Sequence, residues 1–148
     1  MSNSDPDRKN IRVIVADDNL QVREKVLQLL LPEYDVVGTL ANGQAALEAV
    51  LILNPDIALL DISMPLMSGI EVAHALKTRE SQTKVVFLTV HEDVDFVNAA
   101  FDAGASAYVV KSQMASDLRA AISTVDQGGV FVSPMCAFEN SFSDQQPI

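Results

Sequence analysis

The chain has 148 residues, a length that suits a single domain. Hydrophobic residues make up 49% of it and charged residues 20%, so it can bury a proper core, which excludes an intrinsically disordered chain. The formal net charge of -10 would repel phosphate backbones and anionic membranes, which argues against nucleic-acid binding by this chain alone.

Three further features indicate a cytoplasmic protein. The single cysteine, Cys136, excludes an internal disulfide framework and fits a reducing compartment. Residues 1–10 are polar, without the apolar core of a signal peptide, and we expect them to be a disordered leader. No apolar stretch approaches the length needed to span a membrane, so no membrane contact is expected.

The chain alternates between short apolar runs and segments of helical period. In chain order the predicted elements are strand 11–16, helix 20–31, strand 34–40, helix 44–53, strand 56–60, helix 69–79, strand 84–88, helix 92–103, strand 106–110 and helix 113–127. Strict alternation of this kind predicts an α/β protein with a parallel sheet, helices on both faces and right-handed crossovers.

Residue spacing also predicts which helix faces are buried and how one helix begins. Helix 92–103 is expected to carry three acids in its first turn, which suits the helix dipole. The predicted buried positions of the third and last helices are Ile70, Val72, Ala73, Leu76, Met114, Leu118, Ile122 and Val125.

Residues able to handle a phosphoryl group stand at the ends of four predicted strands: Asp17 and Asp18, Asp61, Thr89, and Lys111. The carboxyl ends of parallel strands meet at one edge of a doubly wound sheet, so these side chains should lie together. Carboxylates crowded into one pocket repel one another, and Mg²⁺, which accepts carboxylate, water and phosphate oxygens, would relieve that repulsion. Lys111 could pair with a phosphate oxygen, and Thr89 offers a hydroxyl.

Asp61 directly follows a buried apolar run, and Pro65 and Gly69 shape the loop after it. A carboxylate in this position could attack phosphorus and form an aspartyl-phosphate. The protein would then need only to align the phosphoryl donor and neutralise charge, which the metal and Lys111 could do.

Four separated stretches carry a family resemblance: VADDN at 15–19, DISMPLMSG at 61–69, LT at 88–89 and YVVK at 108–111. Together they resemble the receiver domain of two-component response regulators, over about residues 11–127. The resemblance implies a flavodoxin-like (βα)5 doubly wound fold with strand order 2-1-3-4-5.

The resemblance also implies a function and a set of site residues. Asp61 would accept a phosphoryl group from a sensor histidine kinase. Asp18, Asp61 and the backbone carbonyl of Ser63 would hold Mg²⁺, with Asp17 assisting through water. Thr89 would swing its hydroxyl towards the phosphoryl group, with Tyr108 turning inward behind it. The chain would be a switch that phosphorylates and dephosphorylates itself, and not an enzyme with a free substrate.

The stretch GGVFVSP at 128–134 resembles the region after the last receiver helix in the NarL/LuxR-type subgroup, whose members continue into a DNA-binding helix-turn-helix. We therefore divide the chain into a receiver at 11–128 and a linker-like tail at 129–148. DNA would be reached only through a missing C-terminal domain, and a homodimer through the helices at 92–103 and 113–127 is possible. A stand-alone receiver acting by protein contact stays open.

Several of these residues also have a purely structural interpretation. Asp17 and Asp18 could simply precede a helix, Tyr108 could be ordinary strand packing, and we expect His91 to be an exposed loop residue and Cys136 to be incidental. A Mg²⁺-dependent phosphohydrolase would need a second acid two residues after its nucleophile, where this chain has Ser63. A pseudo-receiver used only for interaction would not need the complete set of strand-end residues.

Overall fold

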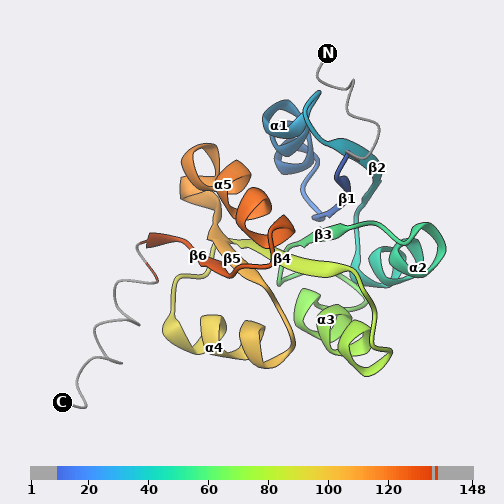
Figure 1. Cartoon of the computed structure of the whole chain (residues 1–148). Helices are drawn as coiled ribbons and strands as arrows, with labels where there is room; N and C mark the ends of the chain where they lie inside the picture. Colours follow the sequence, from blue (N-terminus) through green and yellow to red (C-terminus); the bar gives the residue numbers. More distant parts are fainter. Residues whose placement is uncertain (1–9, 135, 137–148) are drawn as a thin grey trace.

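The structure is a computed structural model that describes residues 10–134 and residue 136. It contains one parallel sheet of six strands in the order β2-β1-β3-β4-β5-β6 (Figure 1). In chain order the elements are β1 (Arg12–Ala16), α1 (Leu20–Leu30), β2 (Asp35–Leu40), α2 (Gly43–Leu53), β3 (Ile57–Leu60), α3 (Gly69–Thr78), β4 (Lys84–Thr89), α4 (Val94–Asp102), β5 (Ala107–Val110), the 3₁₀ turn η2 (Lys111–Gln113), α5 (Met114–Asp126) and β6 (Phe131–Val132).

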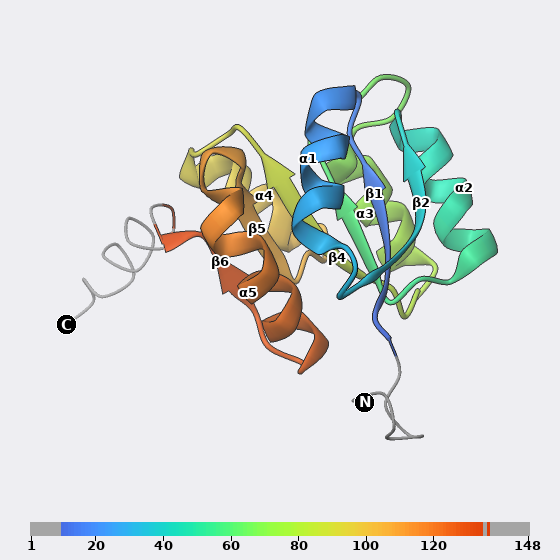
Figure 2. The ribbon, with the colours of Figure 1, turned by 90° about the horizontal axis from the view of Figure 1, so that it is seen from above.

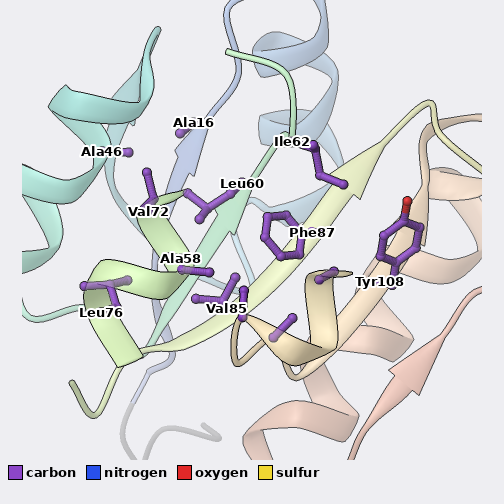
Figure 3. Packing of buried hydrophobic residues seen from close by; sticks show 14 of the residues in the cluster. Ala16, Ala46, Ala58, Leu60, Ile62, Val72, Leu76, Val85, Phe87 and Tyr108 are labelled. Atoms are coloured by element: carbon purple, nitrogen blue, oxygen red, sulfur yellow. The ribbon is translucent and has the colours of Figure 1, made fainter. Parts of the chain in front are cut away.

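Helices cover both faces of the sheet. Figures 1 and 2 show α1 and α5 on one face and α2, α3 and α4 on the other. The central strand β3 has all four of its side chains buried, with Ile57 and Leu59 packed under α1 and α5. Ala58 and Leu60 pack on the opposite side, in a buried cluster that also contains Val72 of α3 (Figure 3). A strand covered on both faces needs this continuous apolar run.

The predicted doubly wound fold and the strand order 2-1-3-4-5 are confirmed. The predicted buried faces also hold: Val72, Ala73 and Leu76 are buried on α3, and Ile70 packs partly buried against them. All four positions predicted for the last helix are buried on α5. None of the helices in the described part of the chain combines the length and hydropathy that crossing a bilayer demands.

Helix α4 begins later than predicted, at Val94 instead of residue 92. Asp93 is its N-cap residue, so Asp95 is the only acid in its first turn and the expected trio of acids is wrong. The backbone carbonyls of His91 and Glu92 instead accept hydrogen bonds from distant parts of the chain, from the Tyr108 hydroxyl and the Cys136 thiol. Tertiary contacts therefore hold these two residues outside the helix.

The sheet extends into the segment that the sequence predicts to be a linker-like tail. Phe131 and Val132 form β6, which pairs in parallel with Ala107 and Tyr108 of β5. Only Ser133, Pro134 and Cys136 are described beyond it, so the remainder of the predicted tail lies outside the described residues, as does the predicted leader except for Asn10.

Gly69 lets the first turn of α3 approach the end of β3. A Cβ atom at this position would lie 2.1 Å from the backbone oxygen of Asp61 and 2.9 Å from the Phe87 ring. The Gly69 amide donates to the carbonyl of Ile62 at 2.8 Å, and Ser68 and Glu71 close a capping box over the helix start. This close approach fixes the backbone that carries Asp61.

We predict that Gly69→Ala lowers the free energy of unfolding by about 2 kcal/mol, because a backbone contact cannot yield as a flexible side chain can. Gly38→Ala is the matched control, since a Cβ there meets Ile14 and Leu53 at an ordinary 3.6 Å. The measurement is urea unfolding followed by circular dichroism. Equal stability of the two variants would contradict the packing argument.

Candidate functional site

The strand-end residues predicted to meet do lie at one edge of the sheet. Asp17 and Asp61 directly follow β1 and β3, which are neighbours in the sheet, and Lys111 directly follows β5. Thr89 is the last residue of β4, between them. Parallel strands bring these positions together because their carboxyl ends all face the same way.

Lys111 joins the two buried carboxylates. Its Nζ lies 2.7 Å from Asp17 Oδ2 and 3.1 Å from Asp61 Oδ2. The two acids are only 2% and 6% exposed. A buried carboxylate without a partner costs several kcal/mol, so the shared ammonium group is what allows both acids to remain inside the protein.

Asp17 is also fixed by the start of α1. Its Oδ1 accepts a hydrogen bond from the backbone amide of Asn19 at 2.9 Å, and its carbonyl accepts one from the guanidinium of Arg23 at 2.7 Å. Its Oδ2 is buried, and the ammonium group of Lys111 at 2.7 Å is the partner that compensates its charge.

A third carboxylate completes an acidic group. Carboxylate oxygens of Asp17, Asp18 and Asp61 all lie within 4.8 Å of one another, with Asp18 exposed to solvent. Three hard oxygen donors, one of them a buried oxygen without an aligned hydrogen bond, fit a small divalent cation that keeps some of its waters. The residues present could therefore hold Mg²⁺. The carbonyl of Ser63 as a further ligand stays a prediction.

The charges in this group perturb one another. Burial raises the pKa of Asp61, Lys111 opposes that effect, and the neighbouring Asp17 adds to it. Burial alone would lower the pKa of Lys111, but its ion pairs with Asp17 and Asp61 outweigh burial and raise it. Lys111 therefore keeps its positive charge, and a further cation beside Asp61 would favour the charged form of this carboxylate.

The two predicted switch residues both contact His91. Thr89 and Tyr108 are fully buried. The Thr89 hydroxyl accepts a hydrogen bond from the His91 amide at 3.3 Å, and the Tyr108 hydroxyl donates one to the His91 carbonyl at 2.9 Å. Figure 3 shows Tyr108 beside the core that contains Phe87. Burial, with smaller contributions from nearby acidic groups, raises the pKa of Tyr108.

His91 is a residue that the sequence interpretation missed. Its side chain is not a free loop histidine, because Nε2 lies 3.2 Å from the hydroxyl of Ser63 and the ring stacks on Phe96 at 4.0 Å. His91 thus links the loop after Asp61 to the loop after Thr89. No local pattern marks it, since Ser63 is 28 residues away in the chain.

The six-stranded sheet gathers two buried acids, an exposed acid, a hydroxyl and a lysine at its carboxyl edge, which defines a doubly wound α/β domain with its polar site at that edge. Comparison with known proteins makes this specific. The family model of the response regulator receiver domain matches residues 13–123. The chain therefore belongs to the response regulator receiver family, and its relatives place it in the NarL/LuxR-type subgroup.

Named relatives support this membership. The chain is 35% identical over 134 residues to the transcriptional regulatory protein DegU of Brevibacillus brevis, covering 89% of this chain and 57% of DegU. It is 35% identical over 136 residues to the probable transcriptional regulatory protein NarL of Mycobacterium tuberculosis, covering 90% of this chain and 62% of NarL. The chain thus spans less than two thirds of the length of either relative.

Solved structures agree with the fold. A LuxR-family two-component response regulator from Aurantimonas sp. SI85-9A1 superposes with a TM-score of 0.86 at 30% identity, covering 92% of this chain and 99% of that one. The signal receiver domain of the putative response regulator NarL from Mycobacterium tuberculosis gives a TM-score of 0.78 at 33% identity, covering 82% and 99%.

We predict that Mg²⁺ at about ten times its dissociation constant stabilises the chain by about 1.4 kcal/mol, because a ligand that binds only the folded state shifts the folding equilibrium towards that state by mass action. Asp18→Asn should abolish that gain while leaving the Lys111 ion pairs intact. Asp35→Asn, which removes one exposed acid at the start of β2, is the control and should keep it. Thermal unfolding with and without MgCl₂ measures the effect. A Mg²⁺ gain in Asp18→Asn equal to that of the parent would contradict the proposed ligand set.

Proposed function

We propose that this chain is a phosphorylation-dependent receiver that accepts a phosphoryl group on Asp61 from a sensor histidine kinase. The observation that carries the proposal is the pair of buried carboxylates, Asp17 and Asp61, held together by one lysine next to a third acid. A structural ion pair needs no such crowding. An acceptor site does, because it must hold both a cation and a dianionic group.

The residues divide the chemistry among themselves. An Asp61 carboxylate oxygen attacks phosphorus, the new O–P bond forms as the bond from phosphorus to the donor breaks, and the electron pair leaves with the donor group. Lys111, already 3.1 Å from Asp61, is placed to pair with a phosphoryl oxygen. Asp18, Asp61 and the carbonyl of Ser63 would hold Mg²⁺ directly and Asp17 would do so through water. The ion, when bound, neutralises charge on the phosphoryl oxygens.

The conformational response would begin at Thr89. A phosphoryl group on Asp61 offers strong acceptor oxygens, and the Thr89 hydroxyl at the neighbouring strand end is the natural donor. The His91 amide now donates to that hydroxyl, so movement of Thr89 would carry His91 with it. Tyr108, which was predicted to turn inward, is already buried with its hydroxyl bonded to the His91 carbonyl, so the shifted loop would stabilise this inward position instead of creating it.

Control of transcription is the output that the relatives suggest. DegU and NarL are named as transcriptional regulators, and each is longer than the region this chain matches. A net charge of -10 makes the chain itself a poor ligand for DNA, so a separate DNA-binding module would be needed. The stand-alone alternative, a receiver acting by protein contact alone, would use the same switch.

We expect acetyl phosphate with Mg²⁺ to label the parent chain, giving a slower band on a Phos-tag gel and a mass gain of one phosphoryl group. Asp61→Asn should remove the label completely, because the amide is not a nucleophile towards phosphorus. Asp35→Asn, with the same change of charge, should label like the parent. Labelling of Asp61→Asn at the parent level would sink the proposal.

A Mg²⁺-dependent phosphohydrolase is the enzyme to exclude. The position two residues after Asp61 is Ser63, whose hydroxyl contacts His91 and is not an acid that could protonate a leaving group. We therefore expect no multiple turnover of a phosphate monoester such as p-nitrophenyl phosphate, measured by release of nitrophenolate. Steady turnover that is lost in Asp61→Asn would favour the hydrolase instead.

A further inference from the structure

The segment that follows α5 is attached to the switch region by its backbone. We call residues 131–134 and 136 the β6 segment. The Phe131 amide donates to the carbonyl of Ser106 at 3.2 Å, and the Ser133 amide donates to the carbonyl of Tyr108 at 2.8 Å. The segment therefore forms hydrogen bonds to the strand that carries Tyr108, at the edge of the sheet (Figure 1).

A buried polar network locks the segment in place. Ser133 is fully buried, and its hydroxyl accepts a hydrogen bond from the Val110 amide at 3.0 Å and donates one to Asp117 Oδ2 at 2.9 Å. Asp117, on α5 and 8% exposed, receives a second hydrogen bond from Ser116 at 3.0 Å. A buried serine with both of its bonds made specifies one docked position, since any other position would remove the hydrogen bonds to Asp117 Oδ2 and from the Val110 amide.

Cys136 connects the segment to the other side of the switch. It is 3% exposed, belongs to the buried cluster that contains Tyr108, and donates through its thiol to the Glu92 carbonyl at 3.7 Å. Glu92 adjoins His91, whose carbonyl receives the Tyr108 hydroxyl. The segment therefore contacts both the strand that carries Tyr108 and the loop whose carbonyl accepts the Tyr108 hydrogen bond.

We propose that docking of the β6 segment and the inward position of Tyr108 are coupled, so that phosphorylation of Asp61 tightens the segment against the receiver. This inference rests on the proposed function and adds the contacts through which phosphorylation of Asp61 would affect the β6 segment after α5. If Tyr108 left its buried position, its bond to His91 would break and the packing of Cys136 would be lost. Each arrangement therefore stabilises the other.

Linkage makes the coupling reciprocal. A phosphoryl analogue that favours the inward position of Tyr108 must strengthen docking of the β6 segment. A change that weakens this docking must lower the affinity for the analogue by the same factor. We expect the coupling to change the affinity for the phosphoryl analogue about fivefold, near the lower end of measured allosteric couplings.

The first test measures hydrogen exchange in the full chain with and without beryllofluoride and Mg²⁺. Exchange in a peptide covering residues 130–136 should slow about fivefold on addition of beryllofluoride. Asp61→Asn, treated identically, should show no change. Unchanged exchange in a parent chain that Phos-tag gels show to be labelled by acetyl phosphate at Asp61 would overturn the inference and leave the proposed function intact. Absence of any labelling at Asp61 would overturn both.

The second test uses a matched pair of serine variants. Ser133→Ala removes both buried bonds of the segment, whereas Ser116→Ala removes a part-buried bond to Asp117 Oδ1 and an exposed bond to the Gln113 carbonyl and leaves both bonds of Ser133 in place. Ser133→Ala should weaken the affinity for beryllofluoride about fivefold, and Ser116→Ala less than about twofold. Equal affinities in the two variants would overturn the coupling. If Ser133→Ala does not fold, the exchange measurement on the parent chain decides.

Discussion

The ion pairs between Lys111 and two buried carboxylates are the interaction on which the rest of this receiver depends. Asp17 and Asp61 end neighbouring strands, so the parallel sheet forces their charges together, and the only described cation in contact with both is Lys111. One positive charge cannot fully balance two negative ones in a poorly solvated site. Burial, with a smaller contribution from the neighbouring Asp17, raises the pKa of Asp61 in spite of Lys111. A divalent cation held by these carboxylates would offset the remaining negative charge, as the proposed function requires.

Tertiary contacts hold the loops around this crowded site in place. The loop after Asp61 is fixed by the close approach of Gly69, and it meets the loop after Thr89 through Ser63 and His91. A charge added at Asp61 would therefore act on the Thr89 hydroxyl and on the His91 backbone, which are already hydrogen-bonded to each other. Packed elements of this kind respond by exchanging one arrangement for another instead of deforming continuously.

The outer edge of the sheet extends this connection away from the chemistry. β6 adds to β5 and is held by Ser133, which forms a buried hydrogen bond to Asp117 of α5. An edge strand of two residues has little stability of its own, so its position depends on such side-chain contacts. The buried hydrogen bonds of Ser133 thus join the segment after α5 to α5 itself and to β5, the strand that carries Tyr108.

The sequence alone determined the fold class and the gathering of acids. Alternating strand and helix patterns dictate a parallel sheet, and a parallel sheet places residues 17, 61 and 111 at one edge whatever the details of packing. Only the tertiary structure decided the roles of His91, Asp117, Ser133 and Cys136, which contact partners 16 to 44 residues away. Residue periodicity cannot report such contacts, because a buried polar residue on a helix and an exposed one look the same in the sequence until the partner that satisfies its hydrogen bonds is in place.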